Sequence, residues 1–336
     1  MPIRTIIEID DREIRVAQAT WEARRAHLSK AFILEIEAGA EPKELGKALR
    51  ESLNKNGFSK GDADVILNRR LIEMRELDLP PAPDDELPDM LKFAARNEFA
   101  SVNDNWRIDF VPLTTEVTAN RIILAGALSP QLLAEITTIV EAGGLRLGRI
   151  LLRSFCVAQS VCNDDPTKSV LIAHDVGNSL DLTLVQDNKV QMTRCVLLSG
   201  DGEPELTQNK SLEIQRAVML ANRGGTARGV GEVRIASDST TGPRIRTALE
   251  SMVDVPVLAL DVSSLISKRG ENLGGKNPQK FLSHYGAAQL LAGVRIAQID
   301  FSKSYVRMPQ SFAAARLCSG TSTSQQFNSA WVNCEP

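Results

Sequence analysis

Hydrophobic and polar positions at the start of the chain follow the pattern of a β-hairpin. Residues 5–9 form a β-rich run, Asp10 and Asp11 give a turn signal, and residues 14–17 form a second short run. A third strand is expected at residues 32–36. The apolar residues that follow recur at the spacing of one helical face, which predicts a helix carrying Leu45, Ala48, Leu49 and Leu53.

The next stretch predicts a small α/β unit. Strands are expected at residues 65–67 and 71–79, and the Pro-Pro pair at 80–81 blocks their continuation. Acidic residues 84–86 then precede a helix, where the helix dipole favours negative charge. A further strand is expected at residues 107–113. The apolar stripe of the helix consists of Leu87, Met90, Leu91, Ala94, Ala95 and Phe99.

Strand and helix patterns continue up to a polar loop. A buried strand is expected at residues 122–125, followed by a helix that begins at Ser129, a serine N-cap with proline after it. This helix stops at the glycine pair 143–144, and residues 150–156 combine the end of a strand with the start of a helix. The loop at residues 163–166 is the best candidate for a boundary between two lobes.

The second half begins with a meander and ends without a clear pattern. Strands are expected at residues 170–173, 180–185 and 190–196, and turns separate them. A helix at residues 212–221 follows, and the pattern is lost from about Phe301. The remaining elements expected before that point are strands at 233–236 and 255–260 and a last helix that starts at 277–278.

Composition places the chain among soluble globular proteins of more than one lobe. The 336 residues exceed what one hydrophobic core usually serves, and 43% are apolar and 24% charged. A net charge of −3 gives no reason to expect nucleic acid as a partner. No apolar run is long enough to span a membrane, and the N-terminus lacks the apolar core of a signal peptide. The five scattered cysteines predict reduced thiols rather than disulfides or a zinc site.

Four segments, in this order, resemble a known family. The first is residues 75–95, a strand ending in Leu-Pro, an acidic spacer and an amphipathic helix that opens Glu-Leu. The others are residues 141–150, residues 170–177 continuing to Arg194, and residues 277–288. Together with the order of elements, they resemble the PilM family of type IV pilus assembly proteins, which belongs to the actin-like superfamily and is related to the cytoplasmic part of the type II secretion protein GspL.

The resemblance implies an α/β, actin-like fold, a duplicated ribonuclease H-like arrangement of two lobes with an inserted small α/β subdomain. Little chain separates Arg194 from the helix at Leu212, so the subdomain that closes the second lobe is expected to be reduced or absent. The expected boundaries are 1–61 and 114–165 for the first lobe, 62–113 for the inserted subdomain, 166–300 for the second lobe with its C-terminal helix, and 301–336 for a disordered tail.

Actin-like ATPases hold phosphates between two hairpin turns, and the resemblance implies a degenerate version of that site. The first turn, residues 8–13, keeps an aspartate but has no glycine, and the adenosine turn at 234–243 lacks the usual Gly-Gly pair. In the second turn, Asp181 replaces the family's Ser or Thr. If Mg-ATP binds, the implied residues are Asp10, Asp175, Gly177, Asn178 and Ser179. The alternative for the second turn is a tight β-turn that needs a permissive glycine.

By the same resemblance, the chain is a docking or scaffold component that is not an enzyme. The implied partner is the short cytoplasmic N-terminal segment of a PilN-like inner-membrane protein, in a pilus or secretion assembly. The expected location is the cytoplasm, at the inner face of the inner membrane and in contact with the membrane only through partners. The competing hypothesis is an ATP-binding switch or a small-molecule kinase on the same fold. The residues expected to contact the partner are Asp85, Glu86, Asp89, Lys92 and Arg96.

Overall fold

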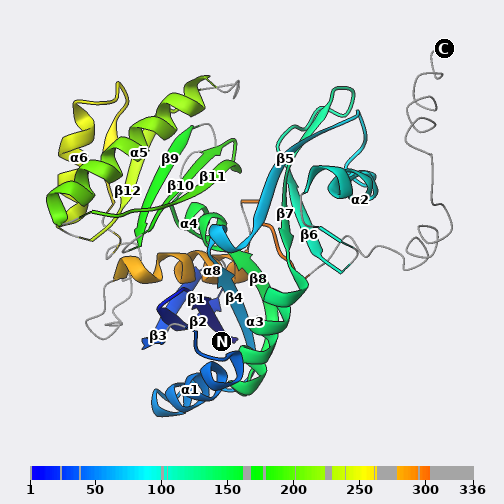
Figure 1. The fold of residues 1–336 in the computed structure, drawn as a ribbon, viewed down its shortest axis with the longest axis vertical. Helices are drawn as coiled ribbons and strands as arrows, with labels where there is room; N and C mark the ends of the chain where they lie inside the picture. The colour runs from blue at the N-terminus through cyan, green and yellow to red at the C-terminus, as the bar shows by residue number, and fades with distance from the viewer. Residues whose placement is uncertain are drawn as a thin grey trace.

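Three β-sheets and the helices that cover them make up the protein. Figure 1 shows the first sheet at the bottom with helices α1 and α3, the second at upper left with α5 and α6, and the third at upper right with α2. The computed structural model describes residues 2–22, 25–37, 39–99, 102–103, 105–161, 168–176, 179–200, 202–223, 229–238, 240–260, 262, 278–293 and 296–302.

The first sheet has five strands in the order β3-β2-β1-β4-β8. The first three strands are antiparallel and the last two run parallel to β1. Both faces of the sheet are covered, and consecutive positions of β1, β2 and β4 are therefore buried on both sides of the sheet. On one face α1 (Pro42–Lys55) and α3 (Pro130–Ala142) pack, and on the other α8 (Leu282–Ala292). The strands are β1 (Ile3–Ile9), β2 (Glu13–Glu22), β3 (Arg25–Glu35), β4 (Asp62–Leu67) and β8 (Arg146–Leu152).

The second sheet repeats this arrangement in the order β11-β10-β9-β12-β13. An antiparallel meander is again followed by two strands parallel to its first strand. Helices α5 (Glu203–Arg223) and α6 (Thr241–Glu250) cover one face. Residues 198–202 alone separate β11 from α5, which leaves no length for a closing subdomain there. The strands are β9 (Val170–Val176), β10 (Ser179–Gln186), β11 (Lys189–Leu197), β12 (Glu232–Ala236) and β13 (Val257–Ala259).

The third sheet is antiparallel, in the order β5-β7-β6, and α2 (Leu87–Glu98) packs on one face. We call β5 (Glu73–Leu79), α2, β6 (Arg107–Pro112) and β7 (Arg121–Leu128) the three-stranded unit. Its limits differ from the expected 62–113. Strand β4 pairs with β1 and β8 and so belongs to the first sheet, whereas β7 is the central strand of the third sheet. Local patterns could not reveal this, because pairing partners are set by tertiary contacts.

A short C-terminal strap, residues 296–302, ties the three-stranded unit to the first sheet. Ile296, Ile299 and Phe301 are completely buried. The Phe301 N–H donates to the Ile150 carbonyl at 3.0 Å, and its carbonyl accepts from Arg107 of β6 at 3.0 Å. The expectation that order is lost at residue 301 is therefore wrong for Phe301 and Ser302. Residues 303–336 and the expected boundary loop at 163–166 lie outside the described residues.

Helices α4 (Arg153–Val161) and α8 pass between the lobes and touch each other closely. Every residue of α4 is buried. A Cβ atom placed on Gly286 of α8 would lie 1.8 Å from the carbonyl oxygen of Cys156. Gly286 is therefore required by the close approach of the two backbones.

Candidate functional site

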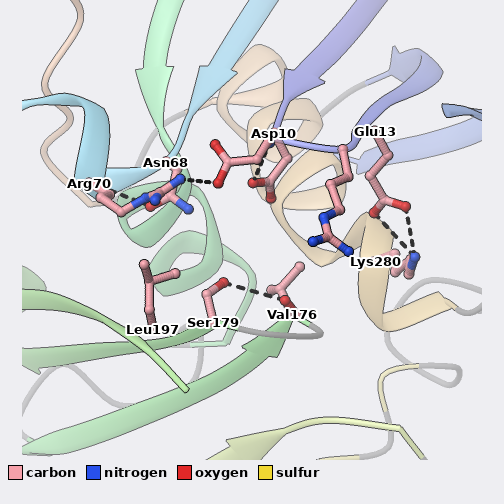
Figure 2. Close-up of a pocket in the computed structure, with 10 residues that line it drawn as sticks. Asp10, Glu13, Asn68, Arg70, Val176, Ser179, Leu197 and Lys280 are labelled. Atoms are coloured by element: carbon pink, nitrogen blue, oxygen red, sulfur yellow. Dashed lines mark hydrogen bonds and ion pairs between the residues drawn. The ribbon is translucent and has the colours of Figure 1, made fainter. Parts of the chain in front are cut away.

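A cleft lies where the turn between β1 and β2 faces the end of β9 and the start of β10. Its cavity is about 300 Å³. Figure 2 shows Asp10 and Glu13 of the first lobe on one side and Val176, Ser179 and Leu197 of the second on the other. Both signs of charge line the cavity, through Asp10, Asp11, Arg12, Glu13, Arg70 and Lys280.

Two N–H groups of the β1–β2 turn form hydrogen bonds within the turn. The N–H of Asp10 donates to the Glu13 carbonyl at 3.0 Å, and that of Asp11 donates to the Asp10 carboxylate at 2.9 Å. An anion-binding nest needs successive N–H groups that point outward and are free. The turn also places three carboxylates beside the cavity, so the cations that line it, Arg12, Arg70 and Lys280, leave no net positive charge for a phosphate. This turn is therefore poorly suited to hold a phosphate.

The Asp10 carboxylate is engaged by two arginines of the protein itself. Its Oδ2 accepts from Arg15 Nη2 at 2.7 Å and from Arg153 Nη2 at 2.5 Å. Both guanidinium groups are almost completely buried. An aspartate that positions Mg²⁺ through water would need to present free oxygens to the cavity. Here two fixed cations already neutralise it.

Behind Asp10 the ion-pair network continues to Glu8, which is completely buried. Its Oε1 lies 2.5 Å from Arg153 Nε and 3.2 Å from Arg15 Nη2, and its Oε2 accepts from Ser283. Burial alone would raise the pKa of Glu8, but the two arginines hold it well below its usual range. The same carboxylates hold the pKa of Arg153 above normal in spite of burial. Glu8 and Arg153 are therefore charged at any ordinary pH.

The two described buried histidines make stability depend on pH. Burial lowers the pKa of His284 to about 4 and lowers that of His174 as well. Both are neutral in the folded protein at neutral pH, whereas in the unfolded chain they protonate near pH 6.5. We expect the free energy of unfolding to fall as the pH drops below about 6.5, by up to about 1.4 kcal/mol per pH unit from His284. Urea denaturation at pH 7.5, 6 and 5 measures this.

A matched variant separates His284 from general acid denaturation. His284→Gln should reduce the loss of stability between pH 6.5 and 5. The variant lacks a side chain that binds a proton in the unfolded chain but stays neutral in the folded protein. An unchanged pH dependence in this variant would contradict the assignment. His27→Gln, at a partly buried position of β3, serves as the control.

Asp175 is also engaged by a cation of the protein. Its Oδ2 accepts from Lys210 Nζ of α5 and from the Ser237 hydroxyl, each at 2.7 Å, and the carboxylate is buried. Ser179 lines the cavity and donates its hydroxyl to the Val176 carbonyl at 3.3 Å. Gly177 and Asn178, also expected in a nucleotide site, lie outside the described residues.

At the expected adenosine turn, Asp238 closes the turn that precedes α6. Its Oδ1 accepts from the N–H groups of Thr240 and Thr241, each at 2.8 Å. Burial alone would raise the pKa of Asp238, but these hydrogen bonds hold it well below the usual range. The turn that the resemblance assigns to adenosine is therefore closed by a carboxylate that is bound to its own backbone.

The residues present do not fit a magnesium nucleotide. Asp10 and Asp175 are paired with arginine and lysine, the first turn offers no free nest, and the cavity is at the lower end of the roughly 300–1,000 Å³ of small-molecule sites. Nor does the described part of the chain group three His, Cys, Asp or Glu side chains as a metal site would. Sequence reasoning missed Arg15, Arg153 and Lys210. For the two arginines the sequence carried a signal, because each lies inside an apolar run, Arg15 at 14–17 and Arg153 at 150–161.

A second candidate site is the outer face of α2. Asp85, Glu86, Asp89 and Arg96 are exposed, and Lys92 is half-buried with its Nζ 2.5 Å from Asp89 Oδ1. Among these polar groups Phe93 is 74% exposed, the highest value for a large hydrophobic residue in the described chain. The sequence pattern did not assign Phe93 to the apolar stripe of the helix, because it falls between the positions expected to be buried. Together these six residues form what we call the α2 face.

Two repeated lobes around a cleft, with a small unit inserted in the first, define the protein as a member of the actin-like fold class. Among solved structures it resembles the PilM-PilN type IV pilus biogenesis complex, with a TM-score of 0.69 at 16% identity over 86% of this chain and 98% of that chain. The cytoplasmic domain of EpsL, an inner-membrane component of the Vibrio cholerae type II secretion system, matches with a TM-score of 0.51 at 11% identity, over 88% and 97% of the two chains.

These likenesses confirm the expected fold and the structural resemblance to PilM. No protein-family model and no curated protein sequence matches the chain. In the described residues no helix is both long and apolar enough to cross a bilayer. Of the five cysteines, Cys156 and Cys195 are described and both are free thiols.

Proposed function

We propose that this chain is a non-enzymatic docking component of an inner-membrane assembly platform, comparable to PilM. It binds the short cytoplasmic N-terminal segment of a PilN-like membrane protein and is held at the inner face of the inner membrane through that partner. The observation that carries the proposal is a contrast. The cleft carboxylates are paired with internal cations, whereas the α2 face offers an exposed aromatic side chain among unburied charges.

The negative charge around the start of α2 supports a basic, membrane-proximal segment as the partner. Around the start of α2, Asp84, Asp85, Glu86 and Asp89 are exposed, and among the described residues Arg121 pairs with Asp84 and Lys92 with Asp89. Cytoplasmic segments next to membrane spans carry an excess of lysine and arginine. An acidic surface with one exposed aromatic anchor suits a short segment of that composition. Among the described residues, the pairing of Asp10 with arginine and of Asp175 with lysine weighs against the alternative of an ATP-dependent switch or kinase.

Calorimetry with a PilN-type N-terminal peptide tests the proposal. The double variant Glu86→Lys with Asp89→Lys should weaken binding about tenfold or more, equivalent to about 1.4 kcal/mol. Glu51→Lys makes a charge reversal on exposed α1 of the first lobe and should leave the affinity unchanged. Equal affinity in wild type and double variant would rule out the α2 face. Titration of wild type with millimolar Mg-ATP should give no heat, and a saturable signal there would favour the alternative.

A further inference from the structure

Arg153 makes ion pairs with both lobes at once. It is the first residue of α4, directly after β8, and its side chain is completely buried. On the first lobe its guanidinium contacts Glu8 of β1 and Asp10 of the β1–β2 turn, each at 2.5 Å. On the second lobe Nη1 lies 3.4 Å from Oδ2 of Asp181 in β10. One cation therefore connects the sheets on the two sides of the cleft.

A second polar bridge runs through the start of α8. The 3-10 turn η2 (Pro278–Phe281) lies between the lobes. On the second-lobe side, His174 Nε2 of β9 is 3.3 Å from the Gln279 carbonyl. On the first-lobe side, Lys280 Nζ is 2.9 Å from Glu13 Oε2, and the Lys280 carbonyl accepts from Arg15 at 3.4 Å. This bridge and Arg153 converge on the same β1–β2 turn.

Opening the lobes would separate these buried charges from their ion-pair partners. Glu8 and Arg153 are completely buried, and Asp181 is almost so. Removing one partner from a buried ion pair leaves a charge without compensation, which is far less favourable than either the intact pair or an apolar replacement. A hinge motion of the lobes is therefore opposed in the absence of any ligand.

We infer that Arg153 is an internal clamp, which takes over the role of a cleft ligand and holds the two lobes at one fixed angle. The described residues of the cleft do not fit a magnesium nucleotide, whereas Arg153 already contacts both lobes. The arginine supplies the positive charge between Asp10 and Asp181 that a bound cation would otherwise provide. The clamp concerns lobe motion and is independent of whether the α2 face binds a partner.

Distance measurement between the lobes tests the clamp. Spin labels are carried by unnatural amino acids at exposed Lys55 in α1 and exposed Glu250 in α6, so that the native cysteines stay in place. Wild type should give one narrow distance distribution that millimolar Mg-ATP leaves unchanged. Arg153→Met removes the charge and keeps an apolar side chain of comparable length, and the distribution should broaden toward other distances.

A matched control distinguishes loss of the clamp from general destabilisation. Arg121 is equally buried and pairs with Asp84, but both belong to the three-stranded unit. Arg121→Met should therefore leave the interlobe distribution narrow. If Arg153→Met does not fold, the interlobe distance distribution is measured on Asp181→Asn instead. This variant removes only the charge of the second-lobe carboxylate and should also broaden the distribution. A folded Arg153→Met or Asp181→Asn protein with an unchanged narrow distribution would overturn the clamp, as would a wild-type distribution that shifts with Mg-ATP.

Discussion

Replacing Gly286 with valine is expected to lower the free energy of unfolding by about 3 kcal/mol or more. A side chain at this position would meet the Cys156 carbonyl oxygen at 1.8 Å and the Ser160 hydroxyl at 2.7 Å. Because the obstacle is helix backbone, rotation of a side chain cannot relieve the clash. The helices would have to separate, and Leu282, Ala287 and Ala288 would lose part of their packing.

Urea denaturation of wild type and Gly286→Val measures this change. Gln289→Val, at a half-buried position of the same helix, is the control for the lower helix propensity of a β-branched residue. This control variant should lower the free energy of unfolding by less than about 1 kcal/mol. Equal stability of Gly286→Val and wild type would show that the two helices are not in backbone contact.

Phe301→Ala is expected to destabilise the protein by about 3–5 kcal/mol. The ring is completely buried and lies against Gly126 of β7, where an added Cβ would be only 3.1 Å from Phe301 Cζ. Loss of the ring leaves a cavity between the three-stranded unit and the first lobe. We also expect faster hydrogen exchange in β6 and β7, since the strap holds these strands against the first sheet.

Phe93→Ala is the matched control, because Phe93 is the same residue type at an exposed position. Its effect on the free energy of unfolding should stay within about 0.5 kcal/mol. Similar stability losses for both phenylalanine variants would contradict the burial of Phe301. A loss of stability without faster exchange in β6 and β7 would mean that the strap does not position the three-stranded unit.

Most strands and helices were predictable from local pattern. The helix at Pro130–Ala142 begins where a serine N-cap and proline indicate, and the Ser129 hydroxyl accepts from the Leu132 N–H at 3.2 Å. The first helix has its expected apolar face, with Leu49 and Leu53 buried. The limits of the inserted unit were misplaced at both ends. Strands 62–67 and 121–128 are apolar enough for either sheet, and only pairing assigns them.

The candidate sites were predictable to different degrees. Asp10 and Asp175 were identified from the two turns that the resemblance supplied. Asp10 lines the cleft, and Asp175 directly precedes Val176, which lines it. Their pairing with Arg153 and Lys210 was not foreseen, because these residues are 143 and 35 positions away. The charges of the α2 face were named in advance, but the exposure of Phe93 depends on which side of α2 packs on the third sheet.

By itself, the sequence determined the alternation of strands and helices, the two-lobed class and the absence of glycine from the first turn. These are local properties, set by spacing, turn chemistry and side-chain size. Tertiary structure alone decided which strands share a sheet, that residues 296–302 bind the three-stranded unit to the first lobe, and that Arg153 reaches Glu8, Asp10 and Asp181 together. Charges far apart in sequence meet only once burial removes water and makes every unpaired charge costly.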